Sequence, residues 1–151
     1  MSGRTPPTGT RAKPVVLFVD DEPALLESIT LALRRGPFGV LTAASARDAT
    51  KLLATTAVDI VVSDERMPGM SGTEFLSRVR QSHPNVMRIA LTGESDLGRT
   101  TQFIRDAELY WVLNKPVQRE ELLRTLERAM NIKRLAEDGA RLRGDGKGRP
   151  P

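Results

Sequence analysis

The chain has 151 residues, a formal net charge of +4 and no cysteine. This length suits one domain with a well-buried core, and the lack of cysteine excludes disulfides and thiolate metal sites. No stretch approaches the roughly 18 apolar residues of a membrane helix, and the N-terminus lacks the apolar core of a signal peptide. We therefore expect a soluble, cytoplasmic protein with no membrane contact.

Much of the positive charge lies at the two ends of the chain. Residues 1–13 and 133–151 are rich in Gly, Pro and Arg. Segments of this composition bury too little apolar surface to offset the entropy lost on ordering. We expect a flexible N-terminal tail over 1–13, one domain over 14–132, and over 133–151 an extension of the last helix that ends in a flexible basic tail. Direct DNA binding is not expected, because a basic tail usually serves as a solubilising or linking segment.

Apolar runs and segments of helical period alternate between the two tails. Pro23 suits the first position of the first helix, Ser45 is a candidate N-cap of the second, and Ser71 or Thr73 precedes the third. The apolar runs predict strands over 15–19, 40–44, 58–63, 86–92 and 109–114. The other helices are expected over 94–106, which is weakly amphipathic, and from 118 to about 136.

This alternation predicts an α/β fold with a parallel sheet and right-handed crossovers. In such a sheet the carboxyl ends of all strands lie at one edge, where ligands bind. Each polar residue at a strand end is unremarkable alone, but five at one edge indicate a site. The five are Asp20, Asp21, Asp64, Thr92 and Lys115.

These residue types suit phosphoryl chemistry. Three neighbouring carboxylates raise one another's pKa unless a cation lies among them, and Mg²⁺ prefers such hard oxygen ligands. A carboxylate oxygen beside bound Mg²⁺ can act as a nucleophile toward phosphorus. Lys115 and a hydroxyl can then bind the oxygens of the transferring group. The pattern predicts a Mg²⁺ site that accepts a phosphoryl group.

Four segments in this order carry a family resemblance: "VLFVDDEP", "DIVVSDERMPGMSG", "RIALTG" and "LNKP". Together they resemble the receiver domain of two-component response regulators, which is CheY-like, over about residues 14–130. The resemblance implies a flavodoxin-like (βα)5 fold, with a five-stranded parallel sheet of order 2-1-3-4-5 and helices on both faces. It also implies a signalling receiver rather than an enzyme, one that catalyses only its own phosphorylation and dephosphorylation.

The resemblance assigns a role to each site residue. Asp64 would be the phosphoacceptor, and Asp20, Asp21, Asp64 and the backbone carbonyl of Arg66 would hold Mg²⁺. Lys115 would bind the phosphoryl group. Lys115 is followed by Pro116, and this pair resembles a Lys-Pro pair of the family whose peptide bond is often cis.

The resemblance also implies partners and a switch. A sensor histidine kinase or a phosphotransfer protein would supply the phosphoryl group, and Thr92 would then move to bind it. The surface of the fourth helix, fifth strand and fifth helix would repack to form a homodimer or to meet an effector.

Two further features of the family fall on identifiable positions. The residues that tune the lifetime of the phosphoryl group would be Arg66 and Glu94, whose opposite charges would screen an attacking water. The family usually has Phe or Tyr three residues before the lysine as a switch ring, whereas this chain has Val112 there. Trp111 and Tyr110 are the neighbouring candidates, although an interface role for Trp111 and a core role for Tyr110 are the simpler interpretation.

Two alternatives concern function. A haloacid-dehalogenase-type phosphatase also uses an aspartate after an apolar strand, but it needs a second aspartate where this chain has Glu22. The chain is otherwise a stand-alone receiver or the receiver part of a longer regulator whose effector is missing. "DERMPGMSG" and "RIALTG" resemble receivers attached to cyclic-di-GMP phosphodiesterase modules, and such attachments vary freely.

Overall fold

The computed structural model describes residues 13–93, 104–105 and 107–145. Its five strands form one parallel sheet of order β2-β1-β3-β4-β5, which confirms the flavodoxin-like topology. The strands are β1 (Val15–Val19), β2 (Gly39–Ala43), β3 (Ile60–Asp64), β4 (Met87–Thr92) and β5 (Trp111–Asn114).

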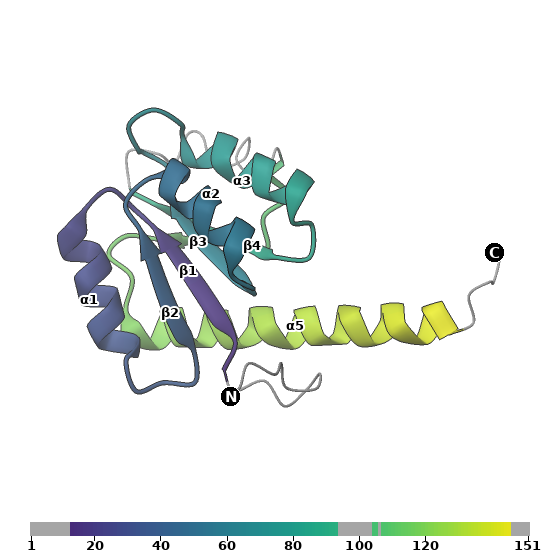
Figure 1. The fold of residues 1–151 in the computed structure, drawn as a ribbon. Coiled ribbons are helices and arrows are strands. Elements are labelled where there is room, and N and C mark those ends of the chain that lie inside the picture. Colours follow the sequence, from purple (N-terminus) through teal and green to yellow (C-terminus); the bar gives the residue numbers. More distant parts are fainter. Residues whose placement is uncertain (1–12, 94–103, 106, 146–151) are drawn as a thin grey trace.

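Helices cover both faces of the sheet (Figure 1). They are α1 (Pro23–Leu33), α2 (Ala46–Thr55), α3 (Gly72–Ser82) and α5 (Arg119–Asp145). One core layer packs the sheet against α1 and α5, and the other packs it against α2 and α3. The helix expected over 94–106 lies largely outside the described residues.

The helices begin where the sequence predicts. Pro23 is the first residue of α1. The hydroxyl oxygen of Ser45 accepts a hydrogen bond from the backbone N–H of Asp48, and Ser71 accepts one from Glu74, both at 3.1 Å. Ser71, not Thr73, is therefore the N-cap of α3.

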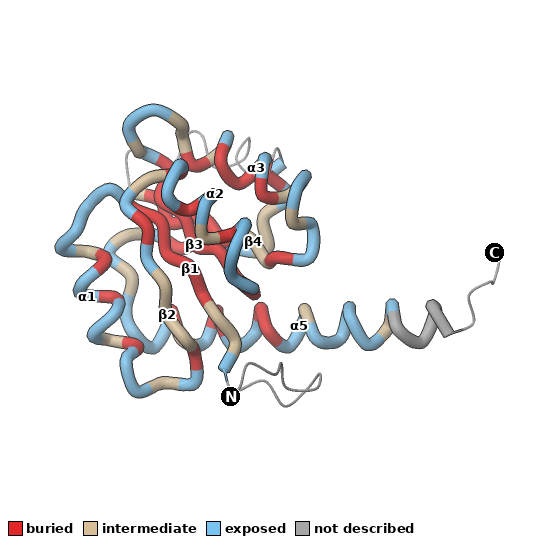
Figure 2. Tube along the Cα trace, viewed as in Figure 1, coloured by how far each residue is buried: buried red, intermediate tan, exposed pale blue. Residues whose placement is uncertain are grey.

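The centre of the sheet is buried because helices cover it on both sides. Every residue of β3 is buried, and so is β1 after its first residue (Figure 2). Side chains alternate between the two core layers along each strand, with Phe18 on one side and Leu17 on the other. The polar residues that follow these strands therefore stand on a well-packed base.

The last helix is longer than the sequence predicted. It was expected to end near residue 136 but continues to Asp145, and it extends well past the sheet (Figure 1). Met130 is its last buried residue among those whose side chains are described, and Leu135 is 70% exposed. Residues 134–145 contain three Arg, two Leu, two Ala and no Pro. Arg, Leu and Ala favour a helix even without a core to pack against. Among the described residues, every helix is too short or too polar to span a membrane.

Candidate functional site

Three aspartates meet at the carboxyl edge of the sheet. Asp20 and Asp21 follow β1, and Asp64 is the last residue of the neighbouring strand β3. One carboxylate oxygen from each lies within 4.8 Å of the other two. Asp20 and Asp64 are buried, whereas Asp21 is exposed, so the cluster opens to solvent on one side.

Lys115, which follows β5, reaches two of these carboxylates. Its Nζ lies 3.0 Å from Asp64 Oδ1 and 3.1 Å from Asp20 Oδ2. Burial alone would lower the pKa of Lys115, but its pairing with Asp64 and Asp20 outweighs that effect and raises the pKa above the usual 10.5. The lysine therefore stays protonated and acts as the counter-ion of the buried pair.

One lysine does not fully compensate the acidic cluster. Burial raises the pKa of Asp64 above its ordinary 3.8, Lys115 counteracts this effect, and the charge of Asp20 adds to it. The Asp20 Oδ1 atom accepts a hydrogen bond of 2.9 Å from Glu22 N. Asp20 Oδ2 is buried and has no hydrogen bond of good geometry among the described residues, with Lys115 Nζ at ion-pair distance.

This donor set fits a small divalent cation. The three residues offer only carboxylate oxygens, which are the ligands that Mg²⁺ prefers, and the exposed side leaves room for the waters that Mg²⁺ keeps. Two buried carboxylates share the single charge of Lys115, and the pKa of Asp64 is still raised, so one more positive charge would be stabilising.

The loop after β3 is tied back to the strand by Glu65, which sequence reasoning missed. The backbone N–H of Gly72 donates to Glu65 O at 2.9 Å, and Glu65 Oε1 accepts from both N and Oγ1 of Thr73 at 2.8 Å. A Cβ at Gly72 would lie 2.1 Å from Asp64 O, so only glycine fits there. The loop held by these hydrogen bonds forms one wall of a shallow pocket. The pocket is lined by Asp21, Glu65, Arg66, Met67, Pro68 and Ser71.

Thr92 and Asn114 pair across the last two strands. Thr92 is fully buried, and its Oγ1 donates to Asn114 Oδ1 at 3.2 Å. The backbone N–H of Lys115 donates to Thr92 O at 2.7 Å, which fixes the lysine to the end of β4. Asn114 was not among the predicted site residues, although it stands directly before Lys115 in "LNKP". Glu94, the proposed partner of the exposed Arg66, lies outside the described residues.

The three switch candidates occupy different environments. Val112 packs against the core on the α2 and α3 side, and Tyr110 packs against the core on the α1 and α5 side. Trp111 is 51% exposed, and its ring centroid lies 6.2 Å from that of Tyr110. The bond between Lys115 and Pro116 is cis, as in the family pattern.

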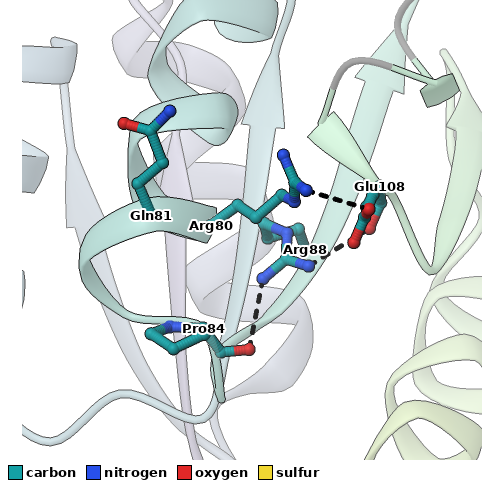
Figure 3. Close-up of a pocket in the computed structure, with 5 residues that line it drawn as sticks. All are labelled: Arg80, Gln81, Pro84, Arg88 and Glu108. Atoms are coloured by element: carbon teal, nitrogen blue, oxygen red, sulfur yellow. Dashed lines mark hydrogen bonds and ion pairs between the residues drawn. The ribbon is translucent and has the colours of Figure 1, made fainter.

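A second hollow lies near the amino end of β4, away from the acidic cluster (Figure 3). Arg88 donates to the carbonyls of Ala107 and Val86, both at 2.9 Å, and Arg80 pairs with the Glu108 carboxylate at 3.0 Å. Both arginines thus bind the protein itself, and they join α3 and β4 to the segment before β5.

Comparison with known proteins identifies the family. Residues 16–127 match the profile of the response regulator receiver domain, and the chain belongs to this family. The hydrogenase transcriptional regulatory protein HoxA of Cupriavidus necator is 35% identical over 127 residues, which are 84% of this chain and 26% of HoxA. The C4-dicarboxylate transport transcriptional regulatory protein DctD of Rhizobium meliloti is 32% identical over 132 residues, 87% of this chain and 28% of DctD. The chain thus spans about a quarter of these relatives.

Solved receiver structures have the same fold. The signal receiver domain of an HD domain-containing protein from Pseudomonas fluorescens is 34% identical with a TM-score of 0.77, and the match covers 81% of this chain and 98% of that one. A CheY-like receiver from Methanospirillum hungatei is 25% identical with a TM-score of 0.77, over 82% and 98% of the two chains. The chain is therefore a signalling receiver, and the haloacid-dehalogenase reading has no support from these comparisons.

Proposed function

We propose that Asp64 is the phosphoacceptor of this receiver and that Mg²⁺ assists its phosphorylation. The observation that carries the proposal is the placement of Lys115 Nζ, 3.0 Å from Asp64 and 3.1 Å from Asp20, beside three converging carboxylates. Asp20, Asp21, Asp64 and the backbone carbonyl of Arg66 would hold the metal. The donor would be a phosphohistidine on a sensor kinase or phosphotransfer protein, and the exchange would occur in the cytoplasm.

Asp64 and Lys115 have separate roles in the proposed phosphoryl transfer. An oxygen of Asp64 forms a bond to phosphorus while the bond from phosphorus to the donor's imidazole nitrogen breaks. Lys115 pairs with an equatorial oxygen of the transferring group, and its raised pKa keeps it charged for this role. Bound Mg²⁺ would supply the remaining positive charge that three carboxylates and a phosphoryl group require. The same residues would support hydrolysis of the aspartyl phosphate.

The switch begins at Thr92 in this proposal. The hydroxyl leaves Asn114 and donates to a phosphoryl oxygen, which is a stronger acceptor because it is charged. Movement at the end of β4 would then repack the surface formed by β5, α5 and the helix that the sequence predicts over 94–106, and Trp111 is exposed on β5. That surface would form a homodimer or bind an effector.

The lifetime of the phosphoryl group would depend on Arg66. Its side chain is exposed and lines the hollow beside the acidic cluster. Paired with Glu94, it would screen the aspartyl phosphate from water. Replacing Arg66 by Ala should shorten the lifetime, and an unchanged dephosphorylation rate would remove this role.

The output of the receiver would lie in a longer regulator. HoxA and DctD are transcriptional regulators, while the Pseudomonas fluorescens neighbour belongs to an HD domain-containing protein. Receivers of this family are thus attached to different effectors, and a stand-alone receiver that binds a partner is the alternative. Sequencing the gene beyond the codon for Pro151 distinguishes the two.

The central test is phosphorylation itself. The protein is incubated with Mg²⁺ and acetyl phosphate, and its intact mass is compared with that of an Asp64→Asn variant. We expect one added phosphoryl group on the wild type and none on the variant, and a sizing column run in parallel reports dimerisation. Equal modification of both chains would show that another residue accepts the group, and modification of neither would contradict the proposed site.

A further inference from the structure

Glu65 is a buried acid that stands between two residues of the proposed metal site and has no assigned role there. It follows Asp64, precedes Arg66, and only 4% of its surface is exposed. It is not one of the three carboxylates that share a common centre. Its Oε1 instead accepts two hydrogen bonds from Thr73, one from the backbone N–H and one from the hydroxyl, both at 2.8 Å.

The main chain of Glu65 makes a third hydrogen bond to the start of α3. Its carbonyl accepts the backbone N–H of Gly72 at 2.9 Å, so three hydrogen bonds close the loop 66–71 at its base. A Cβ at Gly72 would lie 2.1 Å from Asp64 O, which shows how closely the first turn of α3 approaches the end of β3. Both ends of the loop are thereby fixed relative to the strand that carries Asp64.

Arg66 is the first residue of this closed loop, and its carbonyl is the one proposed metal ligand that does not come from an aspartate. Mg²⁺ demands near-ideal octahedral geometry, so a small displacement of one ligand weakens binding. We propose that Glu65 is a positioning residue: by bonding Thr73 it holds the loop so that the Arg66 carbonyl points toward the metal. This inference rests on the proposed Mg²⁺ site and adds to it a residue that would set its affinity.

A purely structural role for Glu65 makes a different prediction. The Glu65 carboxylate accepts a backbone N–H in the first turn of α3. An acid in this position stabilises a helix whether or not a metal binds nearby, so Glu65 could contribute to folding alone. Ser71 caps the same turn, since its Oγ accepts the N–H of Glu74 at 3.1 Å. Ser71→Ala is therefore a matched control, because it removes a cap from the same turn without removing a bond to Glu65.

The test measures the Mg²⁺ dissociation constant by titration calorimetry and the melting temperature of the metal-free protein. Glu65→Leu should weaken Mg²⁺ binding about tenfold, as is common for the partners of metal ligands. Glu65→Gln keeps the oxygen that accepts both bonds and should bind Mg²⁺ within about twofold of the wild type. Ser71→Ala should melt at a lower temperature but bind Mg²⁺ as the wild type does.

Thr73→Val keeps the proposal testable if the Glu65→Leu chain does not fold. It removes only the hydroxyl bond and should weaken Mg²⁺ binding by about threefold. Unchanged binding in the variants that lose these bonds would overturn the inference. Equal losses in Glu65→Gln and Glu65→Leu would also overturn it, because charge and not hydrogen bonding would then be responsible. Absence of Mg²⁺ binding by the wild type would instead refute the proposed metal site itself.

Discussion

The Thr92 hydroxyl donates to the side-chain oxygen of Asn114 at 3.2 Å, across a register pair of β4 and β5. Thr92 is fully buried, whereas Asn114 is exposed. The proposed switch needs this same hydroxyl to turn toward a phosphoryl group on Asp64. In that proposal, Asn114 would compete with the phosphoryl group for the hydroxyl and would stabilise the unphosphorylated arrangement.

Asn114→Ala should favour the switched state. The Thr92 hydroxyl then has no hydrogen bond to Asn114 that must break before it turns toward the phosphoryl group. We expect beryllium fluoride, a phosphoryl mimic, to bind about threefold more tightly, in line with the loss of one modest hydrogen bond. A double-mutant cycle with Thr92→Val provides the control, since Asn114→Ala should have no effect once the hydroxyl is absent. An equal effect in both backgrounds would contradict the competition.

We expect Asp64 to make the metal-free protein less stable as the pH rises. Burial raises its pKa above 3.8, so the folded chain binds this proton more tightly than the unfolded chain. Its contribution to stability is then fully present below the unfolded pKa and lost as the pH rises through the folded pKa. The free energy of unfolding of Asp64→Asn, relative to that of the wild type, should therefore increase as the pH rises above the ordinary pKa of 3.8.

The measurement is urea unfolding of both chains at several pH values, with a chelator present. Lys115 does not titrate in this range, because its pKa is raised above 10.5. A difference between the two chains that stays constant with pH would show that folding does not shift the pKa of Asp64.

Gly72 and Gly69 should respond very differently to alanine. A Cβ at Gly72 would overlap Asp64 O at 2.1 Å, so Gly72→Ala should lower the free energy of unfolding by about 3 kcal/mol or more. Gly69 has a φ of +83° but nothing within 4 Å of its Cβ position, so Gly69→Ala should cost only about 1 kcal/mol of backbone strain. Urea unfolding of the two variants tests this, and equal losses would mean that the approach of α3 to β3 is not tight.

Trp111 should report phosphorylation by fluorescence. It is the single tryptophan of the chain, it is 51% exposed on β5, and its ring lies close to that of Tyr110. Repacking or dimerisation at this surface would change the polarity around the indole and therefore its emission. The Asp64→Asn chain, treated identically, is the control. An unchanged spectrum on fully modified protein would exclude Trp111 from the switch.

Local sequence signals predicted the secondary structure well where the cause is local. The serine caps at Ser45 and Ser71 and the proline that begins α1 act within one helical turn, and the structure has all three. The end of α5 was predicted near residue 136, because the Gly- and Arg-rich composition of the last segment indicated a flexible tail. Helix-favouring residues instead carry it to Asp145.

The sequence by itself determined which residues would gather at one edge. Parallel strands must end on the same side, so the order of apolar runs and polar ends was enough to bring Asp20, Asp21, Asp64 and Lys115 together. Only the tertiary structure decided that Glu65 bonds Thr73 across a loop and that Thr92 bonds Asn114 across two strands. Those contacts depend on how side chains turn once the helices and sheet are packed, and no periodicity in the sequence encodes that choice.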